Sequence, residues 1–142
     1  MNARPEQLAA PTRLDAYRAP AWRVETVELD FDLAIDTTEV TARLHLRRDP
    51  AQTQPLRLDG ENLELLSITL DGSTLSSDAF RYANNVLEVD GARDGSVLET
   101  RVRLRPAANT ALEGLYLSGS AEAGFLLTQC EAEGFRQLTV FP

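Results

Sequence analysis

The residues best suited to bind a ligand lie near the end of the chain, in the stretch TQCEAEGFR at residues 128–136. Two carboxylates there, Glu131 and Glu133, flank one alanine, and Gln129 comes two residues before the first of them. Carboxylates bind ammonium groups through charge-assisted hydrogen bonds, and such residues often sit on ordered loops of a rigid scaffold. The same residues are also typical of a solvated acidic turn, and residue type alone leaves both interpretations open.

The rest of the chain contains few residues suited to other catalytic chemistries. The single histidine, His45, falls on the polar side of an alternating segment, so neither an HExxH zinc motif nor a catalytic triad can be assembled around it. Arg101, Arg103 and Arg105 recur at every second position, which is typical of the solvated face of a strand. We therefore expect no catalytic residue and no metal ligand in this chain.

Composition indicates one soluble domain of moderate size. The chain has 142 residues, of which 43% are hydrophobic and 25% charged. A net charge of −8 argues against nucleic acid or an anionic membrane as a partner. The one cysteine, Cys130, excludes an intrachain disulfide, and no apolar run approaches the roughly 18 residues that span a bilayer. With no signal-peptide pattern at the start, we expect a cytoplasmic protein.

Most of the chain before the acidic stretch alternates apolar and polar residues, as half-buried strands do. The predicted strands are residues 27–35, 40–47, 56–58, 63–70, 80–83, 86–89, 98–104, 125–129 and 135–141. The apolar phase slips once at residues 65 and 66, which predicts a β-bulge. Asp71-Gly72 and Asn84-Asn85 are predicted tight turns. Residues 109–116, NTALEGLY, show neither strand nor helix periodicity and are predicted to form an ordered loop.

These segments predict an all-β fold of antiparallel strands, arranged as a β-sandwich of two packed sheets. Residues 27–35 and 40–47 should pair as a long hairpin, with acids of the first facing arginines of the second, each pair contributing about 0.2–1 kcal/mol. Residues 1–20 are rich in Ala, Pro and Arg and are predicted to be a leader, and residues 21–142 the β-rich domain. No convincing helix and no repeat is expected.

NTALEGLY followed by TQCEAEGFR resembles the N-terminal domain of the aminopeptidase N family, the thermolysin-like zinc aminopeptidases. Residues 17–22, 27–33 and 55–60 fit the same family in order, so the resemblance covers about residues 17 to 142. It implies a saddle-like β-rich domain that rests on a catalytic domain and continues past Pro142. Many relatives carry a second cysteine where this chain has Leu127, which weakens any cysteine pair and leaves the acids unaffected.

The resemblance also implies roles for particular residues. Glu131 would hold the amino terminus of the substrate, and Gln129 would lie at the pocket for its first side chain. Glu133 has no implied substrate role and is expected to stabilise the loop or to be solvated. Cys130 would point the opposite way from its neighbours and fill core space.

The zinc ion, its ligands and the general base would come from the catalytic domain, so this chain itself should bind no cofactor. Its expected partners are a peptide amino terminus and its own catalytic domain. The hypothesis is therefore the substrate-recognition domain of an enzyme that removes N-terminal residues from peptides. The alternative is a non-catalytic β-sandwich interaction module, and the gene sequence beyond Pro142 would distinguish the two.

Overall fold

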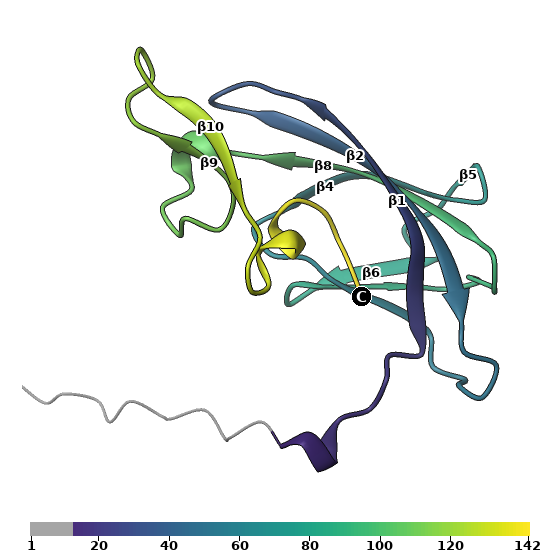
Figure 1. Ribbon diagram of the computed structural model, residues 1–142. Helices are drawn as coiled ribbons and strands as arrows, with labels where there is room; N and C mark the ends of the chain where they lie inside the picture. The colour runs from purple at the N-terminus through teal and green to yellow at the C-terminus, as the bar shows by residue number, and fades with distance from the viewer. Residues whose placement is uncertain (1–12) are drawn as a thin grey trace, which may run out of the picture.

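A computed structural model describes residues 13–142 as an all-β fold with three antiparallel sheets (Figure 1). In chain order the strands are β1 (Trp22–Asp32), β2 (Thr38–Arg48), β3 (Leu56–Asp59), β4 (Glu64–Leu70), β5 (Ser73–Thr74), β6 (Phe80–Ala83), β7 (Val86–Val89), β8 (Val97–Leu104), β9 (Gly114–Ser118) and β10 (Phe125–Gln129). The helices in this part of the chain are short 3-10 turns, namely η1 (Leu14–Ala16), η2 (Pro106–Ala108) and η3 (Gly134–Gln137).

The strands form a five-stranded sheet in the order β1-β2-β8-β4-β5, a three-stranded sheet in the order β3-β7-β6, and a separate pair, β9 and β10. The predicted all-β antiparallel class is confirmed, although the strands divide into three sheets instead of two. Of the predicted leader at residues 1–20, residues 1–12 lie outside the described part of the chain. Residues 13–21 precede β1 and include η1, so the domain boundary stays a prediction.

The predicted hairpin of the first two long strands is confirmed, with a change in its bounds. β1 begins at Trp22, has an irregularity between Val24 and Thr26, and ends at Asp32 instead of residue 35. Arg43 of β2 faces Glu28 of β1 and binds it at 3.1 Å, as the charge pattern predicts. The apolar side of β1 is less covered than predicted, because this strand is the edge of its sheet.

Turns and the bulge follow the local sequence closely. The β4–β8 register shifts between Leu65 and Ser67, where the apolar phase slips. Asp71 has φ of 51° and Gly72 has φ of 81°, so both central residues of the β4–β5 hairpin are left-handed, as a type I′ turn requires. Asn84 and Asn85, between β6 and β7, adopt the same region.

The five-stranded sheet supports two hydrophobic cores, one along each half of its long strands. The first core lies between this sheet and the three-stranded sheet and includes Leu44 of β2 and Leu98 of β8. The second includes Val40 of β2 and Val102 of β8, and Leu115 of β9 packs against them. Strands β2 and β8 therefore pack against the three-stranded sheet at one end and against the β9–β10 pair at the other.

The predicted strand at residues 135–141 is wrong. Its first part is η3, and Leu138, which follows, has αR dihedrals. Leu138 is buried in the second core, whereas Val140 is buried in the first. The alternation of apolar residues that predicts a strand arises here because the segment passes between two cores.

Two contacts hold this passage in place. The hydroxyl groups of Thr139 and Thr100, both buried, lie 3.4 Å apart. The backbone of Phe141 exchanges two hydrogen bonds with Asp59 of β3, at 2.7 and 2.9 Å. These contacts fix the end of the chain to the five-stranded and the three-stranded sheets. The acidic stretch at residues 128–136 directly precedes this fixed segment.

Candidate functional site

The β9–β10 pair brings the two motifs of the sequence together (Figure 1). Gln129 lies opposite Gly114 in the ladder, and Thr128 lies opposite Leu115. The prediction that residues 109–116 form a loop is correct only for residues 109–113, because Gly114–Ser118 is strand β9. Strand β9 lacks the usual alternation of buried and exposed residues, because Gly114 and Leu115 are both buried and the three residues after them are half-buried.

Two glycines allow the motifs to approach each other closely. A Cβ atom on Gly134 would lie 2.5 Å from the carbonyl oxygen of Gln129 and 3.2 Å from the nitrogen of Gly114. A Cβ atom on Gly114 would lie 2.7 Å from the Cβ of Gln137. Favourable contacts between carbon atoms need about 3.5–4.0 Å, so only glycine fits at either position without displacing its neighbours. The backbone on either side of the acidic turn is therefore packed directly against β9.

Asn109 orders the loop that leads into β9. Its side-chain amide donates to the carbonyl oxygens of Glu113 and Leu115 at 2.7 and 2.9 Å. Its side-chain oxygen accepts a hydrogen bond from the backbone N–H of Ala111 at 3.1 Å. One side chain thus closes the loop with three local hydrogen bonds, as asparagine does in turns.

The two acids of the turn have different surroundings. The Glu133 carboxylate lies 2.5 Å from the guanidinium of Arg136, which also binds Glu61 at 3.1 Å. The carbonyl of Arg136 further accepts the backbone N–H of Glu61 at 2.9 Å. Glu133 therefore stabilises the turn, as one of the two sequence-based interpretations expected.

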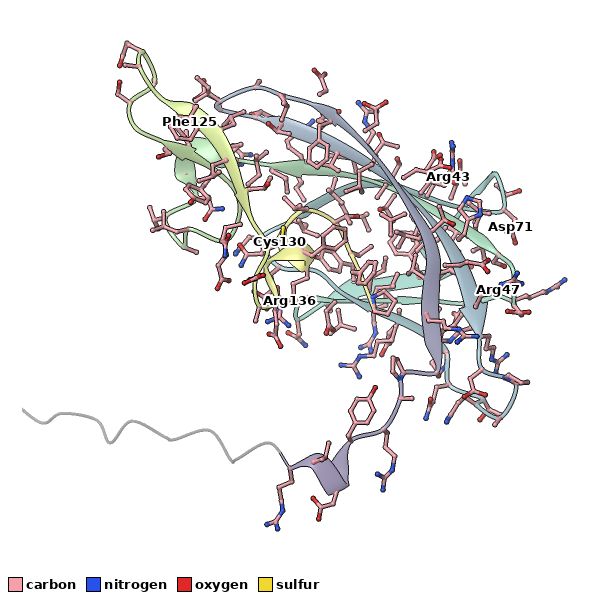
Figure 2. The ribbon with its side chains drawn as sticks, in the orientation of Figure 1. Arg43, Arg47, Asp71, Phe125, Cys130 and Arg136 are labelled. Carbon is pink, nitrogen blue, oxygen red and sulfur yellow. The ribbon has the colours of Figure 1, made fainter. Side chains whose placement is uncertain are left out.

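Glu131 and Gln129 are both exposed, and neither has a side-chain hydrogen bond or ion pair with any residue in the described part of the chain. Cys130, between them, packs against the second core, and its burial raises the pKa of the thiol. Figure 2 shows Cys130 and Arg136 close to each other at the turn. The peptide bond that follows Glu131 is cis.

The cavities nearest to the acidic turn are lined by residues other than Gln129 and Glu131. A cavity of about 420 Å³ on one side is lined by Ala132, Glu133, Arg136 and the end of the chain. A second, of about 480 Å³, lies between the loop at residues 109–111, Gln137 and the side chains of Arg103 and Arg105. Gln129 lines neither of them, so within residues 13–142 the side-chain pocket implied for Gln129 is not formed by these cavities.

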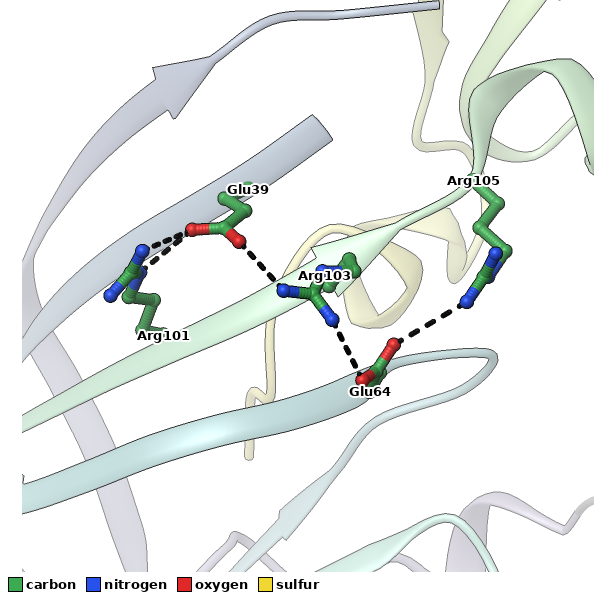
Figure 3. Close-up of polar contacts among 5 residues, drawn as sticks. All are labelled: Glu39, Glu64, Arg101, Arg103 and Arg105. Carbon is green, nitrogen blue, oxygen red and sulfur yellow. Dashed lines mark hydrogen bonds and ion pairs between the residues drawn. The ribbon is translucent and has the colours of Figure 1, made fainter. Parts of the chain in front are cut away.

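The arginine stripe of the sequence forms an ion-pair network across three strands (Figure 3). Glu39 of β2 binds both Arg101 and Arg103 of β8, and Arg103 also binds Glu64 of β4 at 2.9 Å. Arg105 completes the row at 3.7 Å from Glu64. The stripe is a solvated strand face whose charges are largely matched by acids, as predicted. His45 lies on β2 outside this network and opposite Thr26.

Replacing Glu39 with glutamine is expected to lower the melting temperature slightly at neutral pH. Hydrogen bonds from Arg101, then Arg103, hold the pKa of Glu39 below its ordinary value. A lowered pKa in the folded state stabilises the fold above the ordinary pKa, and this stabilisation is lost as the pH falls through the lowered value. The difference between wild type and variant should therefore disappear in acid.

Thermal melts across pH, at low salt and at about 1 M salt, measure this effect, because high salt screens exposed charges. The matched control is Asp30→Asn, which removes an exposed acid of β1 that has no ion pair within residues 13–142. A Glu39→Gln effect that persists in acid would contradict the electrostatic origin.

The described residues contain no group of three or more His, Cys, Asp or Glu side chains placed to hold a metal ion. Residues 13–142 therefore do not fit a zinc site by themselves. Nor does any helix in this range have the length and apolar character needed to cross a bilayer.

Taken together, the fold and the site define an all-β module whose acidic turn packs closely against strand β9. No family model matches the chain. Among curated proteins it is 44% identical to aminopeptidase N of Caulobacter vibrioides over 126 residues, which are 89% of this chain and 14% of that protein. It is 41% identical to aminopeptidase N of Escherichia coli over 125 residues, again 14% of that protein.

Solved structures give the same result. The fold matches Legionella pneumophila aminopeptidase A, solved in complex with aspartic acid, with a TM-score of 0.77 and 25% identity over 92% of this chain and 15% of that one. Native yeast LTA4 hydrolase shares the fold with a TM-score of 0.68, at 15% identity over 85% of this chain and 20% of that one.

Over most of its own length the chain is similar to aminopeptidase N, and it spans 14% of the length of the curated relatives that it matches. Its structure is consistent with the all-β N-terminal domain that the sequence predicts.

Proposed function

We propose that this chain forms one wall of the substrate site of a zinc-dependent aminopeptidase, in which Glu131 binds the protonated amino terminus of a peptide. The observation that carries this proposal is the contrast between two acids of one turn. Glu133 is paired with Arg136, whereas Glu131 is exposed and has no partner among residues 13–142. A carboxylate that is held in place without an internal counterion is free to bind an ammonium group.

Gln129 is proposed to contact the first side chain of the substrate. It is exposed like Glu131, whereas Cys130 between them packs into the core. Gln129 ends β10 and Glu131 begins the turn two residues later, so we propose that these two exposed side chains contact the same ligand. Its neutral amide can donate and accept hydrogen bonds.

Hydrolysis itself is assigned to a catalytic domain outside this chain, where a bound zinc ion would polarise the substrate carbonyl and activate water. Phe125, labelled in Figure 2, and Leu127 are 61% and 40% exposed, and strand alternation places them on the same face of β10 as Gln129. We propose that this apolar face contacts that domain, since exposed apolar surface beside a site favours a protein interface. A cytoplasmic setting without nucleic-acid or membrane partners fits the net charge of −8 and the single cysteine.

The test compares the longer aminopeptidase of this proposal with the chain of residues 1–142. The longer protein should hydrolyse an alanine chromogenic amide and should not hydrolyse its N-acetylated form, which lacks the ammonium group. Residues 1–142 alone should be inactive on both, with or without added zinc, because the described residues provide no ligand set. If the longer protein lacks peptidase activity, the non-catalytic interaction module is the better description. If it cleaves both amides equally, amine recognition is excluded.

A further inference from the structure

Gln137 is a buried amide with no role in the proposal so far. Its side chain belongs to a residue that is only 7% exposed, at the last position of η3. A buried amide is costly unless it is hydrogen-bonded. Its Nε2 donates to the Glu113 carboxylate at 3.0 Å, a charge-assisted bond that joins η3 to the loop before β9.

Gln137 also packs against the start of β9. The Cα of Gly114 is so close that a Cβ atom there would lie 2.7 Å from the Cβ of Gln137 and 3.3 Å from its carbonyl oxygen. Gly114 in turn lies opposite Gln129 in the β9–β10 ladder. Gln137 thus packs against the residue of β9 that pairs with Gln129, the last residue of β10, and the turn that holds the proposed amine anchor follows this strand.

The acidic turn is therefore held at both of its ends by the same short piece of β9. Gln129, before the turn, is held by the ladder, and Gly134, after the turn, packs against the Gln129 carbonyl. η3 begins at Gly134, and Gln137 ends it against Gly114. Glu131 lies between these fixed points, and its exposed side chain has no hydrogen bond or ion pair within residues 13–142 to orient it.

We infer that Gln137 is a positioning residue for the amine anchor, acting through Glu113 and Gly114 on the turn that carries Glu131. This inference rests on the proposed function, because Glu131 must first be the anchor. Gln137 does not touch the substrate. Its loss should shift Glu131 relative to the ammonium group, and small displacements of a binding group are costly in catalysis.

The experiment is a double-mutant cycle in the full-length aminopeptidase. Gln137→Met keeps the length of the side chain and removes its amide, and Gln52→Met is the control at a half-buried glutamine of a distant loop. Gln137→Met should lower kcat/KM on an unblocked dipeptide about 10-fold with Glu131 present, and less than about 2-fold in a Glu131→Gln background. Gln52→Met should have no effect in either.

Glu113→Ala removes the same hydrogen bond from its exposed end and serves if Gln137→Met fails to fold. It should reproduce the roughly 10-fold loss, with the same dependence on Glu131. Equal losses in both backgrounds, or none, would overturn the positioning role while leaving the anchor intact. If Glu131→Gln itself has no effect, the proposed function fails, which is a separately visible result.

Discussion

In the full-length aminopeptidase, Glu131→Gln is expected to lower kcat/KM on an unblocked dipeptide by at least about 100-fold. The substitution keeps the size of the side chain and removes the charge that meets the ammonium group. Loss of one partner of a desolvated charged hydrogen bond costs about 3 kcal/mol, which corresponds to this factor. Folding should be unaffected, because Glu131 is exposed and has no side-chain hydrogen bond or ion pair to lose within residues 13–142.

Glu133→Gln is the matched control, two residues away in the same turn. It removes the pair with Arg136, which keeps its second partner, Glu61. Exposed ion pairs contribute about 0–1 kcal/mol to the stability of the fold, so the turn should keep its structure and turnover should change little. Steady-state profiles and melting temperatures of both variants decide the matter. If the two behave alike, or if Glu131→Gln lowers stability and leaves turnover intact, the acidic stretch is a solvated turn and not an amine anchor.

Gly114→Ala is expected to have the largest effect on stability, a loss of about 2–5 kcal/mol in the free energy of unfolding. Gly114 has φ of +70°, a left-handed conformation that costs an alanine about 1–2 kcal/mol. Its new Cβ would also lie 2.7 Å from the Cβ of Gln137, and overpacking of this kind costs about 1–3 kcal/mol. Urea unfolding of the chain measures the sum.

Gly91→Ala separates the two contributions. Gly91 has φ of +77°, close to that of Gly114, but a Cβ atom there would meet nothing within 4 Å. It should therefore cost only the conformational part, about 1–2 kcal/mol. Equal losses for the two variants would show that the close approach of β9 to η3 does not contribute. Such a result would also remove the geometric basis for a role of Gln137.

Much of the scaffold follows from local sequence. Alternation with a period of two predicts strands wherever one face is buried and the other is wet, as on β2 and β8. Asp71-Gly72 and Asn84-Asn85 predict their turns because few residues adopt a left-handed conformation at low cost. The slip in the apolar alternation at residue 65 predicts a β-bulge, because one extra residue in a strand shifts the alternation by one position. In each case the cause lies within a few neighbouring residues.

The candidate site was predicted in part. The resemblance in residues 109–116 and 128–136 pointed to Gln129 and Glu131, and the residue types in the turn did not by themselves distinguish Glu131 from Glu133. The pair between Glu133 and Arg136, three residues apart, depends on the helical turn at η3, where the sequence pattern predicts a strand. A sequence signal for the close packing was present in Gly114 and Gly134, one in each motif.

By itself, the sequence determined the all-β class and the strand pairs joined by tight turns. Only the tertiary structure decided the path of residues 138–141, the burial of Gln137 and the different states of Glu131 and Glu133. The physical reason is that strands and turns depend on neighbours along the chain. The site depends instead on contacts between segments that are distant in sequence, such as Gly114 with Gln137 and Thr100 with Thr139.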